Sequence, residues 1–224
     1  MDLCIDFKEN WKTTRLGTPI SIYSSLDQKT DPILFIGGVH GDEPEGVELA
    51  QQLIKKLYEI HKKISIWHPW VLIPCINPDG FKNNQRTNSQ GVDLNRNFPC
   101  RDWSSESKAS RYFPGTHPGS ELETQAIISA IEEFKPQVII HFHSWEPCIV
   151  YTGAPGKSWA DEIALHCGYE SKEDIGYPTP GSLGQYGWLE KQIPVICIEE
   201  KEHINLKLVW PRFEKSLLKI LKVM

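Results

Sequence analysis

The hydrophobic and polar positions of this chain alternate between short apolar runs and amphipathic segments. Apolar runs of strand length cover residues 18–23, 33–38, 64–75, 137–143, 149–152 and 194–199. Segments with the spacing of an amphipathic helix lie at residues 44–60, 120–134, 157–167, 182–191 and 211–222. Near-continuous apolar strands that alternate with helices predict an α/β fold, in which helices cover both faces of the sheet.

Local signals indicate where several of these helices begin and end. Pro44 suits the first turn of a helix, because its missing N–H would have no partner there. Ser120, with Glu123 three residues later, has the pattern of a capping box. Gly168 directly follows a predicted helix, in the position where glycine commonly ends one.

Residues 77–120 form a long stretch that is rich in glycine, proline, asparagine and serine. Irregular stretches of this length are uncommon in a compact domain and are usually functional or disordered. The motif NPDG at residues 77–80 is expected to form a turn that orients this stretch.

Three chemically reactive side chains fall at the carboxyl ends of predicted strands. His40 follows one central strand, His143 ends another, and Glu199 ends a third. In α/β sheets, ligands bind at the carboxyl ends of the strands. These three residues are therefore expected to meet at one edge of the sheet.

Length, net charge and the length of the apolar runs limit the classes of protein to which this chain can belong. A length of 224 residues is usual for one α/β domain, so a single domain over residues 1–224 is expected. The formal net charge is −5, whereas a nucleic-acid partner would favour a basic stripe. No apolar run approaches the roughly 20 residues of a membrane span.

The first residues and the cysteines indicate a cellular compartment. No basic segment followed by an apolar one stands at the start, so the predicted location is cytoplasmic. The 6 cysteines contain no CxxC pair, and reduced, structural cysteines are expected. The pattern carries no signal for an oligomeric state.

His40 and Glu43 are the clearest candidates for metal ligands. They lie three positions apart in a turn that opens a helix, so both side chains can converge on one point. By itself this spacing also fits a helix-start histidine and a solvated glutamate. A catalytic zinc ion takes three protein ligands and keeps one position for water. The third ligand is expected at His143, and His141, on the same face of its strand, is the alternative.

Five motifs occur in one order along the chain: HGDEPEG at 40–46, NPDG at 77–80, GVDLNRNFP at 91–99, His143-Ser144, and Glu199. This ordered set resembles the zinc metallocarboxypeptidase family, which includes the pancreatic carboxypeptidases. Within that family it is most similar to the short bacterial murein peptide amidase branch. The resemblance implies a three-layer α/β/α fold with a mixed, mostly parallel twisted sheet, and one bound Zn²⁺ ion.

The resemblance also implies roles in the chemistry for residues that match the motifs. His40, Glu43 and His143 would hold the zinc ion. Arg86 would stabilise the oxyanion, and Glu199 would act as the general base.

Four further residues would contact the substrate, a small peptide with a free carboxylate. Asn95 and Arg96 would grip its terminal carboxylate. Tyr177 would close over the bound substrate, with Tyr186 as the alternative for this tyrosine, and Ser144 would line the binding site.

The same residues make chemical sense without the family. Burial at the end of an apolar strand would raise the pKa of Glu199 toward the range of a general base. The guanidinium of Arg86 suits a developing oxyanion, and that of Arg96 suits bidentate binding of a carboxylate. Asp93 is spaced to accept a hydrogen bond from the free nitrogen of a zinc-bound histidine.

Three functions fit these observations. The first is zinc-dependent removal of a carboxylate-bearing residue from a small peptide, and the resemblance implies cleavage of the γ-D-glutamyl–meso-diaminopimelate bond of murein peptides. The second is an N-acyl amino acid deacylase of the desuccinylase or aspartoacylase kind, which shares the HxxE start. The third is a non-catalytic zinc-dependent protein that binds a carboxylate. The intact run at 91–99 favours the first, and Glu199 with Arg86 argues against the third.

Overall fold

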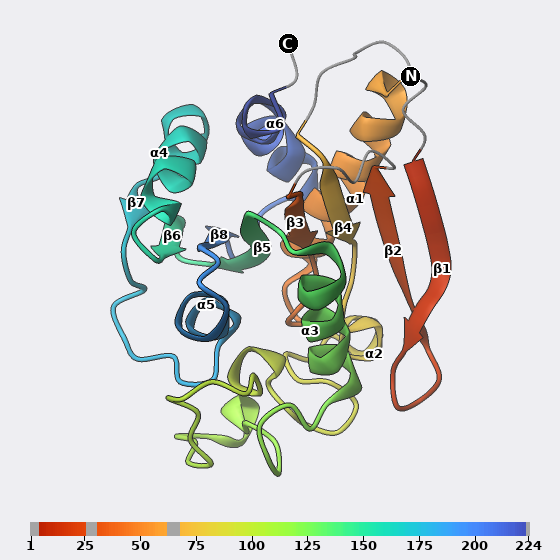
Figure 1. The fold of residues 1–224 in the computed structure, drawn as a ribbon, viewed down its shortest axis with the longest axis vertical. Helices are drawn as coiled ribbons and strands as arrows, with labels where there is room; N and C mark the ends of the chain where they lie inside the picture. Colours follow the sequence, from red (N-terminus) through yellow and green to blue (C-terminus); the bar gives the residue numbers. More distant parts are fainter. Residues whose placement is uncertain (1–4, 26–30, 62–67, 223–224) are drawn as a thin grey trace.

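An eight-stranded sheet runs through the parts of the chain that the computed structural model describes, residues 5–25, 31–61 and 68–222 (Figure 1). The strands lie in the order β1-β2-β4-β3-β5-β8-β6-β7. Their bounds are β1 Ile5–Thr13, β2 Pro19–Ser25, β3 Ile33–Ile36, β4 Trp70–Ile73, β5 Val138–Trp145, β6 Cys148–Thr152, β7 Ser171–Lys172 and β8 Val195–Lys201. Parallel pairs join β4, β3, β5 and β8 at the centre, and β6 to β7. Antiparallel pairs join β1 to β2, β2 to β4 and β6 to β8, so the sheet is mixed and mostly parallel.

Helices cover both faces of this sheet. They are α1 Pro44–Ile60, α2 Pro78–Asn83, α3 Leu122–Phe134, α4 Gly156–Cys167, α5 Leu183–Gln185 and α6 Val209–Ile220. Helices α1, α4 and α6 pack on one face with Ile33 and Phe35 of β3. Helices α3 and α5 pack on the other face with Leu34 and Ile36. Since successive strand residues point to opposite faces, β3 contributes to both cores, and the predicted three-layer arrangement is confirmed.

The edge strands are the part of the sheet that the apolar pattern does not predict. Among the described strands, β1 pairs with β2 alone, and most of its side chains are exposed. An exposed edge strand needs no apolar run, so the pattern gives no sign of it. β7 is two residues long. Of the strand predicted at 64–75, residues 70–73 form β4, and residues 64–67 lie outside the described ranges.

The long polar stretch contains short helices instead of irregular chain alone. The NPDG motif, expected as a turn, is the start of α2, where Asn77 Oδ1 accepts a hydrogen bond from the Gly80 N–H at 3.0 Å. Two 3₁₀ turns, Leu94–Arg96 and Ser110–Tyr112, follow. Local caps of this kind order a segment that has few apolar residues.

Two helix predictions need correction in detail. Helix α3 begins at Leu122, and the hydroxyl of Ser120 donates to Glu121 Oε1 instead of capping the helix. The helix expected at 182–191 consists of the single turn of α5 and a π-helical turn, Tyr186–Glu190. At Ser120, Asn97 Nδ2 donates to the hydroxyl oxygen at 2.9 Å, so a side chain from elsewhere in the fold competes with the local cap.

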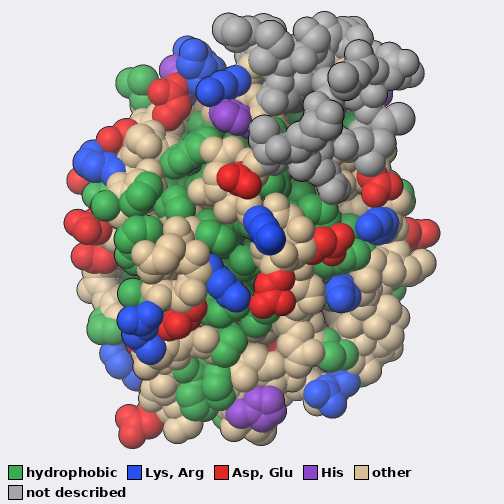
Figure 2. All heavy atoms as spheres, in the orientation of Figure 1, with side chains coloured by type: hydrophobic (Ala, Val, Ile, Leu, Met, Phe, Trp, Pro, Cys, Tyr) green, Lys and Arg blue, Asp and Glu red, His purple; other side chains and the backbone are tan. Residues whose placement is uncertain are grey.

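The charges on the surface and the state of the cysteines match what the sequence leads one to expect. The face in Figure 2 carries acidic and basic side chains interspersed, as the mild net charge leads one to expect. Each cysteine within the described ranges has a free thiol; these are Cys75, Cys100, Cys148, Cys167 and Cys197. Cys4 lies outside the described residues. Among the described helices, none is long and apolar enough to span a bilayer.

Candidate active site

The carboxyl ends of β3, β5 and β8 meet at one edge of the sheet, where the predicted site residues lie. His40 follows β3 in the turn that opens α1, and His143 and Glu199 are register partners on β5 and β8. Gly46, in the first turn of α1, lies against the backbone of β5. A Cβ atom at this position would be 2.5 Å from the carbonyl oxygen of Phe142. Glycine therefore allows the start of α1 to approach β5 closely.

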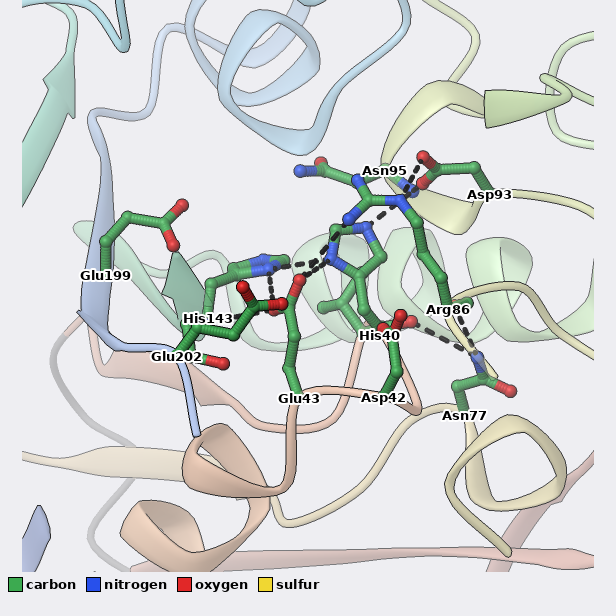
Figure 3. A network of polar contacts seen from close by, with 12 residues as sticks. His40, Asp42, Glu43, Asn77, Arg86, Asp93, Asn95, His143, Glu199 and Glu202 are labelled. Carbon is green, nitrogen blue, oxygen red and sulfur yellow. Dashed lines mark hydrogen bonds and ion pairs between the residues drawn. The ribbon is translucent and has the colours of Figure 1, made fainter. Parts of the chain in front are cut away.

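Three potential ligand side chains converge between the start of α1 and β5 (Figure 3). His40 Nδ1 lies 2.7 Å from Glu43 Oε1, and His143 Nδ1 lies 2.7 Å from Glu43 Oε2. The two imidazole Nδ1 atoms are 3.0 Å apart. Ligand atoms that sit about 2.0–2.1 Å from a tetrahedral zinc ion are roughly 3.3 Å from one another, so the spacing and the donor types fit zinc. This group is called the ligand cluster below.

The charges of the ligand cluster suit a cation. Burial by itself would raise the pKa of Glu43, but the His40 and His143 imidazoles hold it well below its ordinary value. Glu43 is therefore anionic. Burial lowers the pKa of His143, which favours the neutral imidazole that a metal ion requires.

The ring nitrogens that face away from the ligand cluster also have partners. His40 Nε2 lies 3.1 Å from Asp93 Oδ1, so the predicted contact with Asp93 is confirmed. His143 Nε2 lies 2.8 Å from His141 Nδ1. Such partners fix the tautomer of a metal-binding histidine and the orientation of its ring. Both histidines are thus held with Nδ1 toward Glu43.

His141 lies behind His143 and does not reach the His40–Glu43 pair. Burial, followed by the charges of His143 and His40, holds the pKa of His141 well below its ordinary value, so its neutral ring can accept the N–H of His143. His141 and His143 also form a group with Cys197 that is close enough to hold an ion. Burial raises the pKa of Cys197 well above its ordinary value, which disfavours a thiolate ligand. The ligand cluster therefore fits a metal ion better.

Glu199 lies beside the ligand cluster and is almost fully buried. Burial, and then the Glu43 carboxylate, raises its pKa to about 8. A divalent cation at the ligand cluster would offset the Glu43 charge and bring this pKa closer to neutrality, where a general base is most effective. Glu200 points to the other face of β8, where it pairs with Arg212 Nε at 3.0 Å. The two neighbouring carboxylates therefore have separate surroundings.

Arg86 reaches from the long polar stretch to the ligand cluster. Its Nε donates to Asp93 Oδ2 at 2.9 Å, and its Nη1 donates to Glu43 Oε1 at 3.3 Å. The ring of Tyr112 stacks on the guanidinium, with Cζ 5.2 Å from the ring centroid. These contacts hold a positive charge where it can stabilise an oxyanion next to the metal ligands.

Asn95 and Arg96 lie in the 3₁₀ turn that follows Asp93. The Leu183 N–H donates to Asn95 Oδ1 at 2.9 Å, which leaves the amide nitrogen of Asn95 as the donor for a ligand. Nη1 of Arg96 donates to the Asn95 carbonyl at 2.6 Å. Both side chains line the cavity that also holds the ligand cluster. The volume of this cavity is about 240 Å³.

Tyr177 lies at the mouth of this cavity. It is 45% exposed, and its ring meets that of Trp145 edge-on with the centroids 5.7 Å apart. Gly181, further along the same segment, has a φ of +68°, and a Cβ there would lie 2.4 Å from the Arg96 carbonyl oxygen. This close approach holds the segment that contains Tyr177 against Arg96. Tyr186, the alternative, is buried in the core.

Ser144 lines the cavity, but its hydroxyl group already has a hydrogen-bond partner. Its hydroxyl donates to Glu45 Oε2 at 2.8 Å, and its backbone N–H donates to Glu43 Oε2 at 3.2 Å. Ser144 therefore orients Glu43 of the ligand cluster. Because its hydroxyl and its N–H both have partners, neither is free for the substrate contact that the resemblance implies.

Several cavity residues carry no signal in the sequence. His141 was expected only as an alternative ligand, and Arg111, Tyr112 and Glu202 match no motif, yet all four line the cavity. Arg111 and Tyr112 come from the long polar stretch, whose length was the one hint that it is functional. Only the folded chain brings them next to β5.

The fold and the ligand cluster together define a class of zinc hydrolase, and sequence comparison gives the same class. The profile of the zinc carboxypeptidase family matches residues 13–177 of this chain. Since the match covers more than half of the sequence, the chain belongs to the zinc carboxypeptidase family, whose members are hydrolytic enzymes. The matched residues include the motifs at 40–46 and 91–99 and end before Glu199.

Two individual proteins are similar to this chain over most of its length. Murein peptide amidase A of Escherichia coli (strain K12) is 31% identical over 190 residues, which cover 80% of this chain and 75% of that protein. Murein peptide amidase A of Vibrio campbellii is 27% identical over 196 residues, which cover 82% of this chain and 75% of the relative.

Solved structures bear out the fold prediction. Murein-tripeptide amidase MpaA from Escherichia coli O157 superposes with a TM-score of 0.79 at 25% identity, over 97% of this chain and 92% of that one. Bovine thrombin-activatable fibrinolysis inhibitor superposes with a TM-score of 0.81 at 18% identity, over 99% and 90% of the two chains. The second protein shares the fold.

Proposed function

We propose that this protein is a zinc-dependent amidase that removes a carboxylate-bearing residue from a small murein-derived peptide. One observation carries the proposal. The ligand cluster, the buried Glu199 carboxylate, the Arg86 guanidinium and the Asn95–Arg96 pair all line a single cavity. This combination supplies a metal site, a base, an oxyanion donor and a carboxylate donor within reach of one substrate.

Each group has a role that follows from its chemistry. His40, Glu43 and His143 would hold a zinc ion, which would supply Lewis acidity for a carbonyl group and for water. Glu199 takes a proton from the attacking water and passes it to the leaving amine. Arg86 donates N–H groups to the carbonyl oxygen as that oxygen gains negative charge.

The substrate is held by two groups at its carboxylate end. Asn95 and Arg96 donate to the free carboxylate of the leaving residue, and the planar guanidinium of Arg96 suits bidentate binding. Tyr177 covers the bound residue from the mouth of the cavity, and Ser144, which lines the cavity, holds Glu43 in position. These contacts place the amide bond next to Glu199.

The murein substrate is supported by the relatives. Both murein peptide amidases resemble this chain over three quarters of their own length, and one solved relative is a murein-tripeptide amidase. We therefore propose that the bond cleaved is the amide between γ-D-glutamate and meso-diaminopimelate. Incubation with the free tripeptide, followed by chromatography of released diaminopimelate, tests this assignment directly.

The Glu199→Gln variant tests the catalytic part of the proposal. It should still bind one equivalent of zinc, measured by atomic absorption, because Glu199 is not in the ligand cluster. Its kcat/KM for the tripeptide should fall about 10²- to 10⁴-fold, the usual contribution of a general base. Unchanged turnover would refute the assignment of the base.

Glu202→Gln is the matched control for this experiment. Glu202 is an exposed carboxylate that lines the same cavity three residues further on. This variant should keep most of its turnover. Equal losses in both variants would indicate that a general change of charge in the cavity, and not loss of a base, lowers the rate.

Comparing the hydrolysis rates of two kinds of substrate tests the alternative that the protein is an N-acyl amino acid deacylase. An N-acyl amino acid, such as N-succinyl or N-acetyl aspartate, offers a carboxylate but no murein peptide. The family match and the relatives favour the peptidase. Faster hydrolysis of the N-acyl amino acid than of the tripeptide would reverse this choice.

Three further features are part of the proposal. One zinc ion per chain is supported because both groups of potential ligands among the described residues share His143. One catalytic domain over residues 1–224 is supported because a single sheet takes strands from residue 5 to residue 201. The cytoplasmic location remains a prediction from the sequence.

A further inference from the structure

Arg111 is the one guanidinium among the described cavity residues that has no role in the proposed chemistry. Arg86 and Arg96 line the cavity as the oxyanion donor and the carboxylate donor. Arg111 lies in the 3₁₀ turn Ser110–Tyr112 and lines the same cavity. A positive charge placed beside a substrate site selects for negative charge on the substrate.

The contacts of Arg111 leave most of its hydrogen-bond donors free. Its Nη2 lies 3.4 Å from Asp42 Oδ2, and this is its one side-chain polar contact within the described part of the chain. The side chain is 54% exposed. The guanidinium lies over the ring of Tyr112, with Cζ 5.5 Å from the ring centroid. Since an arginine has five N–H donors, four remain for a ligand.

Arg111 and the Asn95–Arg96 pair contact different elements around the cavity. Asn95 accepts a hydrogen bond from the Leu183 N–H at the start of α5, whereas Arg111 contacts Asp42, which precedes Glu43 of the ligand cluster. Figure 3 shows Asn95 and Asp42 on opposite sides of His40. With the leaving residue at Asn95 and Arg96 and the scissile bond at the ligand cluster, the acyl part of a peptide would extend toward the contact between Asp42 and Arg111.

We propose that Arg111 is a specificity residue that binds a free carboxylate on the acyl side of the scissile bond. This inference rests on the proposed function. In a γ-linked glutamyl amide the side-chain carboxyl group forms the amide, so the α-carboxylate stays free close to the bond that breaks. A guanidinium binds a carboxylate through two parallel, charge-assisted hydrogen bonds. An acyl residue that is linked through its α-carboxyl group offers no carboxylate at this position.

A pair of substrates that differ in one group tests the inference. The first is L-alanyl-γ-D-glutamyl-meso-diaminopimelate, and the second carries an amide in place of the α-carboxylate of the glutamyl residue. The readout is the ratio of kcat/KM for the two. The wild-type protein should prefer the free carboxylate roughly 10- to 100-fold, the range of one hydrogen bond between charged groups. Arg111→Gln should bring the ratio close to one.

Two further variants control for folding and for charge. Arg101→Gln removes another exposed arginine, which pairs with Glu190 outside the cavity, and should leave the ratio unchanged. Arg111→Lys keeps the positive charge and should retain part of the preference. Melting temperatures of all variants show whether the fold is intact.

The outcomes separate this inference from the proposed function. If the wild-type protein hydrolyses neither peptide, both the proposed function and the inference about Arg111 are wrong. If it hydrolyses both and the ratio is the same in wild-type and Arg111→Gln protein, the inference alone is overturned. If Arg111→Lys loses as much of the preference as Arg111→Gln, charge is not the property that is recognised.

Discussion

At the scale of single residues, the site depends on a few buried charged groups that neutralise one another. Asp93 is fully buried and accepts hydrogen bonds from both His40 Nε2 and Arg86 Nε. Arg86 in turn contacts Glu43. Asp93 therefore orients His40 of the ligand cluster and Arg86 at the same time.

Asp93→Asn should weaken zinc binding. The asparagine keeps the shape of the side chain but loses the charge that holds His40 in the ligand tautomer, and such outer contacts contribute about 10- to 100-fold to metal affinity. Competition with a chromogenic chelator measures the change. Asp174→Asn, at an exposed carboxylate, is the control. An affinity within twofold of wild type would show that Asp93 does not orient His40.

The raised pKa of Glu199 predicts how the stability of the metal-free protein depends on pH. The pKa is about 8 in the folded chain, against an ordinary value of 4.5. Between these values the folded state holds the proton more tightly than the unfolded state, so the free energy of unfolding should fall as the pH rises. A difference of one in pKa between the folded and unfolded states corresponds to about 1.4 kcal/mol, so the difference between 4.5 and about 8 sets an upper limit of roughly 5 kcal/mol.

Urea unfolding of the metal-free protein at pH 5.5 and pH 8 measures this dependence. Glu199→Gln cannot ionise, so its free energy of unfolding should fall less over the same interval. The difference between the two proteins isolates Glu199 from the other titrating groups of the site. A steeper fall in the variant would contradict the raised pKa.

At the scale of elements, the site is a junction between the start of α1 and the carboxyl end of β5. The turn at residues 40–43 carries two members of the ligand cluster and β5 carries the third, while β8 brings Glu199 alongside. The close packing at Gly46 sets the distance between α1 and β5. The geometry of the ligand cluster therefore depends on a backbone contact that involves none of its three side chains.

Gly46→Ala should disturb this junction. The added methyl group would overlap the Phe142 carbonyl and push the start of α1 away from β5, at a cost of about 1–3 kcal/mol in the free energy of unfolding. Zinc affinity should fall as well, because Glu43 moves away from His143. Denaturation and chelator competition measure the two effects.

Gly156→Ala is the matched control for this change. Gly156 also begins a helix, but a Cβ there would meet its neighbours at 3.3 Å or more. It should lower the stability less and leave zinc affinity unchanged. Equal effects of the two substitutions on zinc affinity would argue against the role of Gly46.

At the scale of the whole molecule, the site lies where the central strands meet between two hydrophobic cores. The strands β3, β5 and β8 contribute apolar residues to the cores on both faces and polar residues at their ends. A metal ion at this edge would join segments that are 100 positions apart in sequence. Metal binding should therefore stabilise the native state as a whole.

Removal of zinc with a chelator should lower the melting temperature. A ligand present at 1,000 times its dissociation constant stabilises the native state by about 4 kcal/mol, and a chain of this length shifts by roughly 2–4 °C per kcal/mol. Differential scanning calorimetry measures the shift. His40→Ala should show little response to zinc or chelator. A melting temperature that does not depend on zinc in the wild-type protein would contradict the metal site.

The sequence by itself determined the central strands, the covering helices, the ligand pair His40–Glu43 and the ordered motifs, because these follow from local periodicity and short-range spacing. Only the tertiary structure decided that His143 and not His141 joins that pair, that Ser144 turns its hydroxyl to Glu45, and that Arg111 reaches the cavity. It also revealed the exposed edge strand β1. These features depend on contacts between residues far apart in the chain, and the pairing of strands and the packing of helices set such contacts without leaving a local pattern.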